Sequence, residues 1–241
     1  AERFRPRRPP PLWRHLPRQP GAGPGLEKIR LGPAVHGPGA CQPWHAGPYT
    51  GRWQQAVCIA SGPSLTQADC EAARRWREDG QGRGIGRAVF VTNTTFRRCP
   101  WADVIYGLDL AWWREHLTEV RAQCAGLLVS PQPKLQPLGI RCERAWLGGE
   151  RTNSGAALIA QAAWWGVRQV TLLGYDLQRL DGRAHWHADH PAGLGNADGI
   201  ARWPAQFRAV LPRLAGMHIV NATRSTALDL FPLATLEDAL S

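Results

Sequence analysis

Short apolar runs alternate with segments of helical spacing along this chain, and this alternation constrains the fold more than any other feature of the sequence. The runs typical of buried strands lie at 56–60, 88–92, 103–106, 127–129, 169–173 and 218–220. Apolar residues recur with helical spacing over 66–78, 111–123, 153–165 and 202–214. Strands that alternate with helices are typical of parallel sheets. The sequence therefore predicts an α/β, Rossmann-like domain with a mostly parallel open sheet and helices on both faces.

Polar residues follow the ends of four expected strands. They are Ser61, Asn93, Asp109 and Asp176. The carboxyl ends of parallel strands meet along one edge of a sheet, and ligands of such folds bind at that edge. We therefore expect these four residues to lie together beside a ligand.

The first 55 residues differ in composition from the rest of the chain. They hold eight Arg and one Lys against two Glu, so they carry +7 of the net charge of +10, and they hold eleven of the twenty prolines. We expect an extended Arg/Pro-rich arm over 1–55 and a folded domain over 56–241. A solvated tail and an arm that binds nucleic acid or a partner protein are both open, and Trp13, Trp44 and Trp53 favour the binding arm.

Two further patterns bear on where the chain resides. No run of eighteen apolar residues occurs, and the charged, proline-rich stretch 1–11 does not resemble a signal peptide. The six cysteines are scattered without a CxxC pair. We therefore expect reduced thiols, no membrane contact and residence in the cytoplasm.

The turn Ser61-Gly-Pro-Ser64 joins the first expected strand to the first expected helix. Its glycine permits close approach of the backbone, and free amides at the helix start together with the Ser64 hydroxyl suit a phosphate. A tight turn with a helix cap explains the same residues, with either Ser64 or a capping box of Thr66 and Asp69 as the cap. The glycine-rich run 80–86 precedes a strand instead of following one, so we interpret it as a flexible connection.

Two other segments combine a structural and a functional interpretation. Arg151-Thr-Asn-Ser-Gly155 opens an alanine-rich helix, where Asn153 or Ser154 suits the N-cap. Leu173-Gly-Tyr-Asp176 places a carboxylate at a strand end, where it either caps a loop or lies near a ligand.

Histidines are densest in His185-Trp-His-Ala-Asp-His190. A histidine with a pKa near 6.5 serves as a general base at neutral pH. His187 and His190 also suit a metal, although the sequence shows no fourth ligand. A coincidental cluster in a surface loop is the third interpretation.

Taken in order, these segments resemble bacterial lipooligosaccharide sialyltransferases. The motifs are Gly-Pro-Ser-Leu at 62–65, a strand ending in Asn93, Arg-x-x-Ser-Gly at 151–155, Gly-x-Asp at 174–176 and the histidine motif at 185–190. The set is also similar to 6-hydroxymethylpterin pyrophosphokinase-like proteins. It is most similar to uncharacterised phage-encoded proteins that share Pro-Trp-Ala-Asp at 100–103, Asn-Ser-Gly at 153–155, Leu-Gly-Tyr-Asp at 173–176 and His-Trp-His-x-Asp-His-Pro at 185–191. The resemblance covers roughly residues 56–232 and implies a phage protein in the cytoplasm of a bacterial host or in the virion.

This resemblance implies a glycosyltransferase-like enzyme that uses a nucleotide sugar as donor and needs no metal. The implied nucleotide-binding residues are Gly62, Pro63, Ser64, Asn93, Asn153, Ser154, Gly155 and Tyr175. Arg151 would face the acceptor or the sugar carboxylate, and Asp176 would lie beneath the donor. His190 would deprotonate the acceptor hydroxyl, and His187 is the alternative because the motif is one residue longer here.

One position departs from the family pattern. Gln178 stands where the family carries a phosphate-binding tyrosine. The loss of such a donor costs roughly 2–4 kcal/mol of transition-state stabilisation where oxyanion donors have been removed. Two classes of function therefore stay open: a nucleotide-dependent transferase, and a non-catalytic phage virion or morphogenesis protein whose arm binds neighbouring subunits or DNA.

Overall fold

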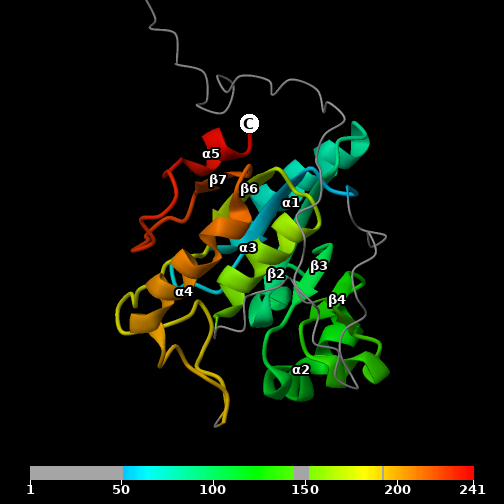
Figure 1. Cartoon of the computed structure of the whole chain (residues 1–241), viewed down its shortest axis with the longest axis vertical. Coiled ribbons are helices and arrows are strands. Elements are labelled where there is room, and N and C mark those ends of the chain that lie inside the picture. The colour runs from blue at the N-terminus through cyan, green and yellow to red at the C-terminus, as the bar shows by residue number, and fades with distance from the viewer. Residues whose placement is uncertain (1–50, 144–151, 192) are drawn as a thin grey trace, which may run out of the picture. The chain divides into compact units, whose positions relative to one another are not determined.

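The computed structural model describes residues 51–143, 152–191 and 193–241. Their centre is one sheet of seven parallel strands in the spatial order β5-β4-β3-β2-β1-β6-β7 (Figure 1). The strands are β1 (Gln55–Ile59), β2 (Arg87–Thr92), β3 (Val104–Tyr106), β4 (Leu127–Ser130), β5 (Arg141–Cys142), β6 (Gln169–Leu173) and β7 (His218–Asn221). The predicted Rossmann-like α/β fold is confirmed.

Helices cover both faces of this sheet. They are α1 (Gln67–Gly82), α2 (Leu110–Gln123), α3 (Ser154–Trp164), α4 (Trp203–Val210) and α5 (Leu236–Ala239), with short 3₁₀ turns η2 (Asn93–Arg97), η3 (Pro133–Leu138), η4 (Ile200–Arg202) and η5 (Leu211–Leu214). Side chains alternate along β1: Ala56 and Cys58 belong to the core under α3 and α4, and Val57 and Ile59 to the core under α1 and α2. Burial on both faces explains why the strands are short, continuous apolar runs.

The strand order reverses beside β1. The chain runs outward from β1 to β5 on one side, then returns to place β6 on the other side of β1. The loops that follow β1 and β6 therefore lead away toward different parts of the sheet. In open α/β sheets this reversal creates a crevice at the carboxyl ends of the strands, where ligands bind.

Three local expectations need correction. The two-residue strand β5 was not predicted, because Arg141 and Cys142 form no apolar run. The glycine-rich run 80–86 is not wholly a flexible connection, since α1 continues to Gly82. The single helix expected over 202–214 is divided into η4, α4 and η5, and Pro212 lies in the first turn of η5, where it interrupts the α-helical hydrogen bonds.

Trp53 belongs to the core and not to a binding arm. Its ring lies 5.1 Å from that of Phe90 and 5.5 Å from that of Trp165, measured between centroids. The expected arm otherwise lies outside the described residues up to position 50, so the boundary at residue 55 stays a prediction.

Two further findings concern cysteines and membranes. Cys58, Cys70, Cys99 and Cys124 are free thiols. Among the described residues, no helix combines the length and the apolar character that crossing a membrane requires.

Candidate functional site

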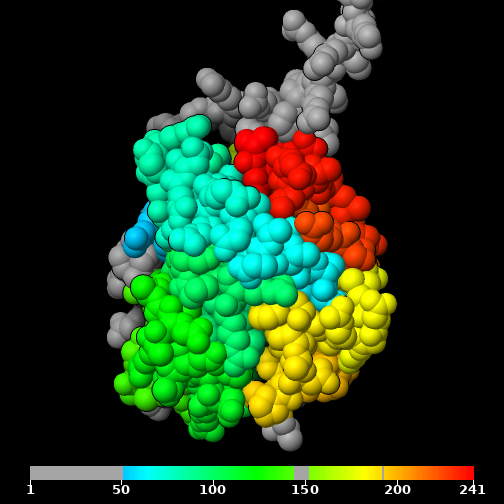
Figure 2. Space-filling view, turned by 180° about the vertical axis from the view of Figure 1, so that it is seen from behind, coloured from blue at the N-terminus to red at the C-terminus, as the bar shows by residue number. Residues whose placement is uncertain are grey.

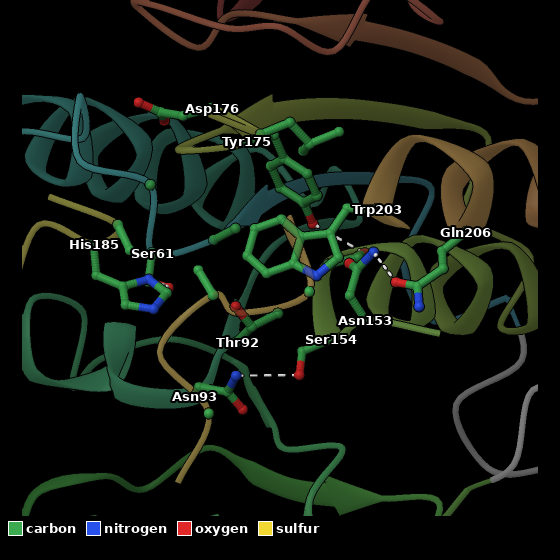
Figure 3. A pocket seen from close by; sticks show the side chains of 18 of the residues that line it. Ser61, Thr92, Asn93, Asn153, Ser154, Tyr175, Asp176, His185, Trp203 and Gln206 are labelled. Atoms are coloured by element: carbon green, nitrogen blue, oxygen red, sulfur yellow. Dashed lines mark hydrogen bonds between the residues drawn. The ribbon is translucent and has the colours of Figure 1, made fainter. Parts of the chain in front are cut away.

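A cavity of about 390 Å³ lies at the carboxyl edge of the sheet (Figure 3). The four strand-end residues expected along one edge all line it: Ser61, Asn93, Asp109 and Asp176. The start of α3, the loop that follows β6, and residues from η4 and α4 also line it. A polar cavity of this size at the strand ends is the usual ligand site of such a fold.

The start of α3 leaves backbone donors open in this cavity. Asn153 is the N-cap, and its Oδ1 accepts the N–H of Ala156 at 2.9 Å. The Ala157 N–H donates to the Asn153 carbonyl. Within the described residues, the N–H groups of Ser154 and Gly155 therefore have no protein acceptor. Open amides at a helix start attract anionic groups such as phosphate.

Asn93 lies beside this helix start. Its Nδ2 donates to the Ser154 hydroxyl at 3.1 Å, and its Oδ1 is buried with no protein partner. The backbone of Asn93 has φ of 47°, in the left-handed region that asparagine tolerates better than most residues. The end of β2 thus turns sharply and leaves one polar acceptor at the cavity.

Tyr175 contributes to the cavity from the end of β6. It is 1 % exposed, and its hydroxyl donates to the Gly155 carbonyl at 3.4 Å. Burial raises the pKa of this phenol, so it stays protonated. A Cβ at Gly155 would lie 3.0 Å from the Tyr175 ring, so glycine permits their close approach.

Asp176 faces the Gly62–Ser64 turn instead of the middle of the cavity (Figure 3). Its Oδ2 accepts the Ser64 N–H at 2.8 Å, and a Cβ at Gly62 would lie 1.9 Å from its Oδ1. Burial raises the pKa of this carboxyl, while the hydrogen bonds from Ser64 oppose the shift. The carboxylate holds the turn after β1 against the end of β6.

The turn expected to bind phosphate is therefore closed. The Gly62 N–H donates to the Gly174 carbonyl at 2.8 Å, and the Ser64 N–H is taken by Asp176. Gly62 lines the cavity, whereas Pro63 and Ser64 do not. The cap of α1 is the Thr66–Asp69 capping box, so of the two caps considered the second is correct.

Two of the three clustered histidines line the cavity: His185 and His190. His187 does not, although its ring lies 4.8 Å from that of His190. Burial lowers the pKa of His187 and of His190 to about 4, so both are neutral at neutral pH. His185 lies with its Nδ1 3.1 Å from the Ser61 hydroxyl, and burial lowers its pKa as well.

Several lining residues were not predicted from the sequence. Trp203 and Gln206 lie on one face of α4, and the Gln206 Oε1 accepts a hydrogen bond from the Asn153 Nδ2 at 3.1 Å. Arg202 precedes them and brings a positive charge to the lining. The only sequence signal was polar and aromatic residues on a helix otherwise interpreted as core.

The remaining expected residues have different outcomes. Gln178 lines the cavity but donates from its Nε2 to the Ser225 hydroxyl at 2.9 Å. Arg151 lies outside the described residues. Over the described ranges, no three His, Cys, Asp or Glu side chains are arranged to hold a metal ion.

Comparison with known proteins adds one likeness. No protein-family model and no curated protein matches the chain. Among solved structures, the crystal structure of the sialyltransferase CST-II in complex with trisaccharide acceptor and CMP is similar, with 12 % identity and a TM-score of 0.44. The similarity covers 78 % of this chain and 88 % of that chain.

Proposed function

We propose that the protein is a nucleotide-dependent transferase of the glycosyltransferase kind. The observation that carries the proposal is a single cavity at the strand ends that combines open backbone donors at α3 with neutral histidines. The donors suit the phosphate of a nucleotide sugar, and a neutral histidine suits an acceptor hydroxyl that must lose a proton.

The nucleotide is proposed to lie against the start of α3. The open N–H groups of Ser154 and Gly155 would donate to its phosphate oxygens, and Arg202 would balance part of their charge. Asn93 would offer its free Oδ1 to a ribose hydroxyl. These donors and the guanidinium take over the stabilisation of the leaving group, because Gln178 is already engaged with Ser225.

The proposed reaction is a single displacement. The acceptor oxygen attacks the anomeric carbon and forms the new glycosidic bond. The bond between that carbon and the phosphate oxygen breaks, and its electron pair leaves with the nucleotide. His190 accepts the proton of the acceptor hydroxyl, because it lines the cavity and is uncharged at neutral pH. The His187 ring lies 4.8 Å from the His190 ring, between centroids, but His187 does not line the cavity.

Isothermal titration of the full chain against nucleotides and nucleotide sugars tests this proposal. We expect nucleotides of one nucleobase to bind, and the nucleotide sugar with that nucleobase to bind at least as tightly as the free nucleotide. Ser154→Trp should abolish binding, because the indole fills the helix start. Ala205→Trp is the matched control, since Ala205 is exposed on α4 outside the cavity lining. No binding by any nucleotide, or equal binding by the Ser154→Trp variant, would contradict the proposal.

A chelator separates this mechanism from the metal interpretation of the histidines. We expect turnover with a chosen donor to be unchanged by excess EDTA. Loss of turnover in EDTA, restored by Zn²⁺ and mimicked by a His187→Ala, His190→Ala double variant, would favour a metal site instead.

A further inference from the structure

The histidines form a cluster that joins two parts of the fold, in which His116 is buried and His185, His187 and His190 are half-buried. The rings of His185, His187 and His190 lie 4.8 to 5.6 Å apart between centroids. His116 from α2 adds a fourth ring, 6.0 Å from that of His190. The Nε2 atoms of His116, His185 and His187 are buried without a protein hydrogen-bond partner.

The segment 185–190, here called the histidine segment, packs against the residues that follow β1 and η2, and Trp186 also packs against the core under α1 and α2. The Trp186 N–H donates to the Ser61 carbonyl at 3.1 Å, and the Arg98 guanidinium lies 4.0 Å from the Trp186 ring centroid. Figure 2 shows the yellow surface of this part of the chain against the cyan and green surface of the residues that follow β1 and β2. Because His185 and His190 also line the cavity, docking of the segment completes the cavity wall.

We propose that the histidine segment is an acid-sensitive wall of the cavity, docked while its imidazoles are uncharged and released when they take up protons. Release removes two lining residues, so ligand binding falls with it. The docking half of this inference stands on the histidine packing alone. The binding half rests on the proposed function.

Charged groups around the cluster oppose protonation in the docked state. Arg97 disfavours positive charge on His116, His187 and His190, and Arg179 does so on His185. Nearby carboxylates favour the protonated histidines. Asp189 raises the pKa of His185 and His190, and Glu115 and Glu119 raise that of His116. Burial outweighs these carboxylates, so the pKa of every histidine in the cluster is lowered.

The sign of the pH effect follows from these shifts. A released histidine titrates near its ordinary value of 6.5, whereas docked His187 and His190 titrate near 4. Between these values the released form binds more protons, so the docked form loses stability as the pH falls below about 6.5. Each of the two histidines shifts the equilibrium by up to about tenfold per pH unit within this window.

Hydrogen exchange on the full chain tests the docking half. We expect the protection factor of the Trp186 amide, corrected for the intrinsic rate, to fall at least 30-fold between pH 7.5 and pH 5.0. Protection of the β6 amides should stay constant. Unchanged protection at Trp186, or a parallel loss in β6, would overturn the proposal, because the second result is global unfolding.

Non-titrating variants test the cause. His187→Phe and His116→Phe each keep an aromatic ring and remove a titrating group, so the drop in Trp186 protection should shrink in each, and by several-fold in His187→Phe. His218→Phe is the control, since His218 lies in β7 outside the cluster. An undiminished drop in both cluster variants would contradict the proposal.

Nucleotide titrations at the same two pH values separate the two halves. Affinity that falls in parallel with Trp186 protection supports both. Release of the segment with unchanged affinity overturns the binding half alone. Release of the segment in a chain that binds no nucleotide at any pH leaves the docking half intact and contradicts the proposed function.

Discussion

Two helix starts look alike in sequence: the Gly62–Ser64 turn, which leads into α1, and residues 153–155, which open α3. Each combines serine with glycine, the kind of segment from which phosphate binding is inferred, but of the first turn only Gly62 lines the cavity. At the Gly62–Ser64 turn the amides are taken by Gly174 and Asp176, whereas at α3 the amides of Ser154 and Gly155 have no acceptor among the described residues. A glycine–serine turn therefore indicates only that another group approaches the backbone closely. Whether that group belongs to the protein or to a ligand depends on whether the amides of the turn already have a protein acceptor.

Removal of the proposed base is expected to have the largest effect. His190→Ala should lower turnover by about 10²–10⁴ and leave donor affinity nearly unchanged, as expected for loss of a general base. Steady-state kinetics with the donor found by titration measures both. His187→Ala should be milder, because His187 does not line the cavity. Equal losses in both variants would show that the cluster acts as a unit.

The two helix starts are expected to respond differently to an added methyl group. Gly62→Ala should lower the free energy of unfolding by about 2–4 kcal/mol, because its Cβ would lie 1.9 Å from the Asp176 carboxylate and 2.5 Å from the Gly174 carbonyl. Gly155→Ala should lower it less, by about 1 kcal/mol, since a Cβ there would lie 3.0 Å from a Tyr175 ring carbon, 3.2 Å from the Asn153 Oδ1 and 3.4 Å from a Phe207 ring carbon, contacts that small shifts relieve. Urea denaturation measures both.

Nucleotide affinity completes this comparison. Gly155→Ala should weaken binding while the protein stays folded, because Gly155 lines the cavity at the open helix start. An unstable Gly155→Ala variant together with a stable Gly62→Ala variant would contradict this, because it would mean that the start of α3 is held by protein contacts and the Gly62–Ser64 turn is open to a ligand.

The sheet was predictable because its strands are buried on both faces, which leaves continuous apolar runs such as 88–91 in the sequence. The meeting of Ser61, Asn93, Asp109 and Asp176 followed from topology, since parallel strands end at one edge. No local pattern predicts that the Asp176 carboxylate accepts the Ser64 N–H, because 112 residues separate the two in the sequence.

The helix α4 also makes contacts at the cavity that the sequence alone does not predict. Its periodicity indicates a helix, but the face that Trp203 and Gln206 present to the cavity depends on its packing beside α3. Asn153 and Gln206 form a hydrogen bond across 53 positions of sequence. Contacts of this separation are fixed by tertiary structure, so a single sequence does not reveal them.

The smallest expected effect concerns the charge at the closed turn. Burial raises the pKa of Asp176 in the folded protein, so the folded state binds more protons than the unfolded state in the window just above 3.8. Stability therefore falls as the pH rises through that window, and the ionised carboxylate is unfavourable at neutral pH. Asp176→Asn should raise the free energy of unfolding at pH 7, and its advantage should diminish toward pH 4.

The same variant decides whether Asp176 serves the turn or the ligand. If the carboxylate only holds the Gly62–Ser64 turn, Asp176→Asn keeps an oxygen for the Ser64 N–H and leaves nucleotide affinity unchanged. Asp198→Asn is the matched control, because Asp198 lines the cavity but is exposed, so its stability should not change. A loss of affinity in Asp176→Asn without a loss of stability would mean that the turn after β1 is part of the ligand site, and that the two helix starts act together on one ligand.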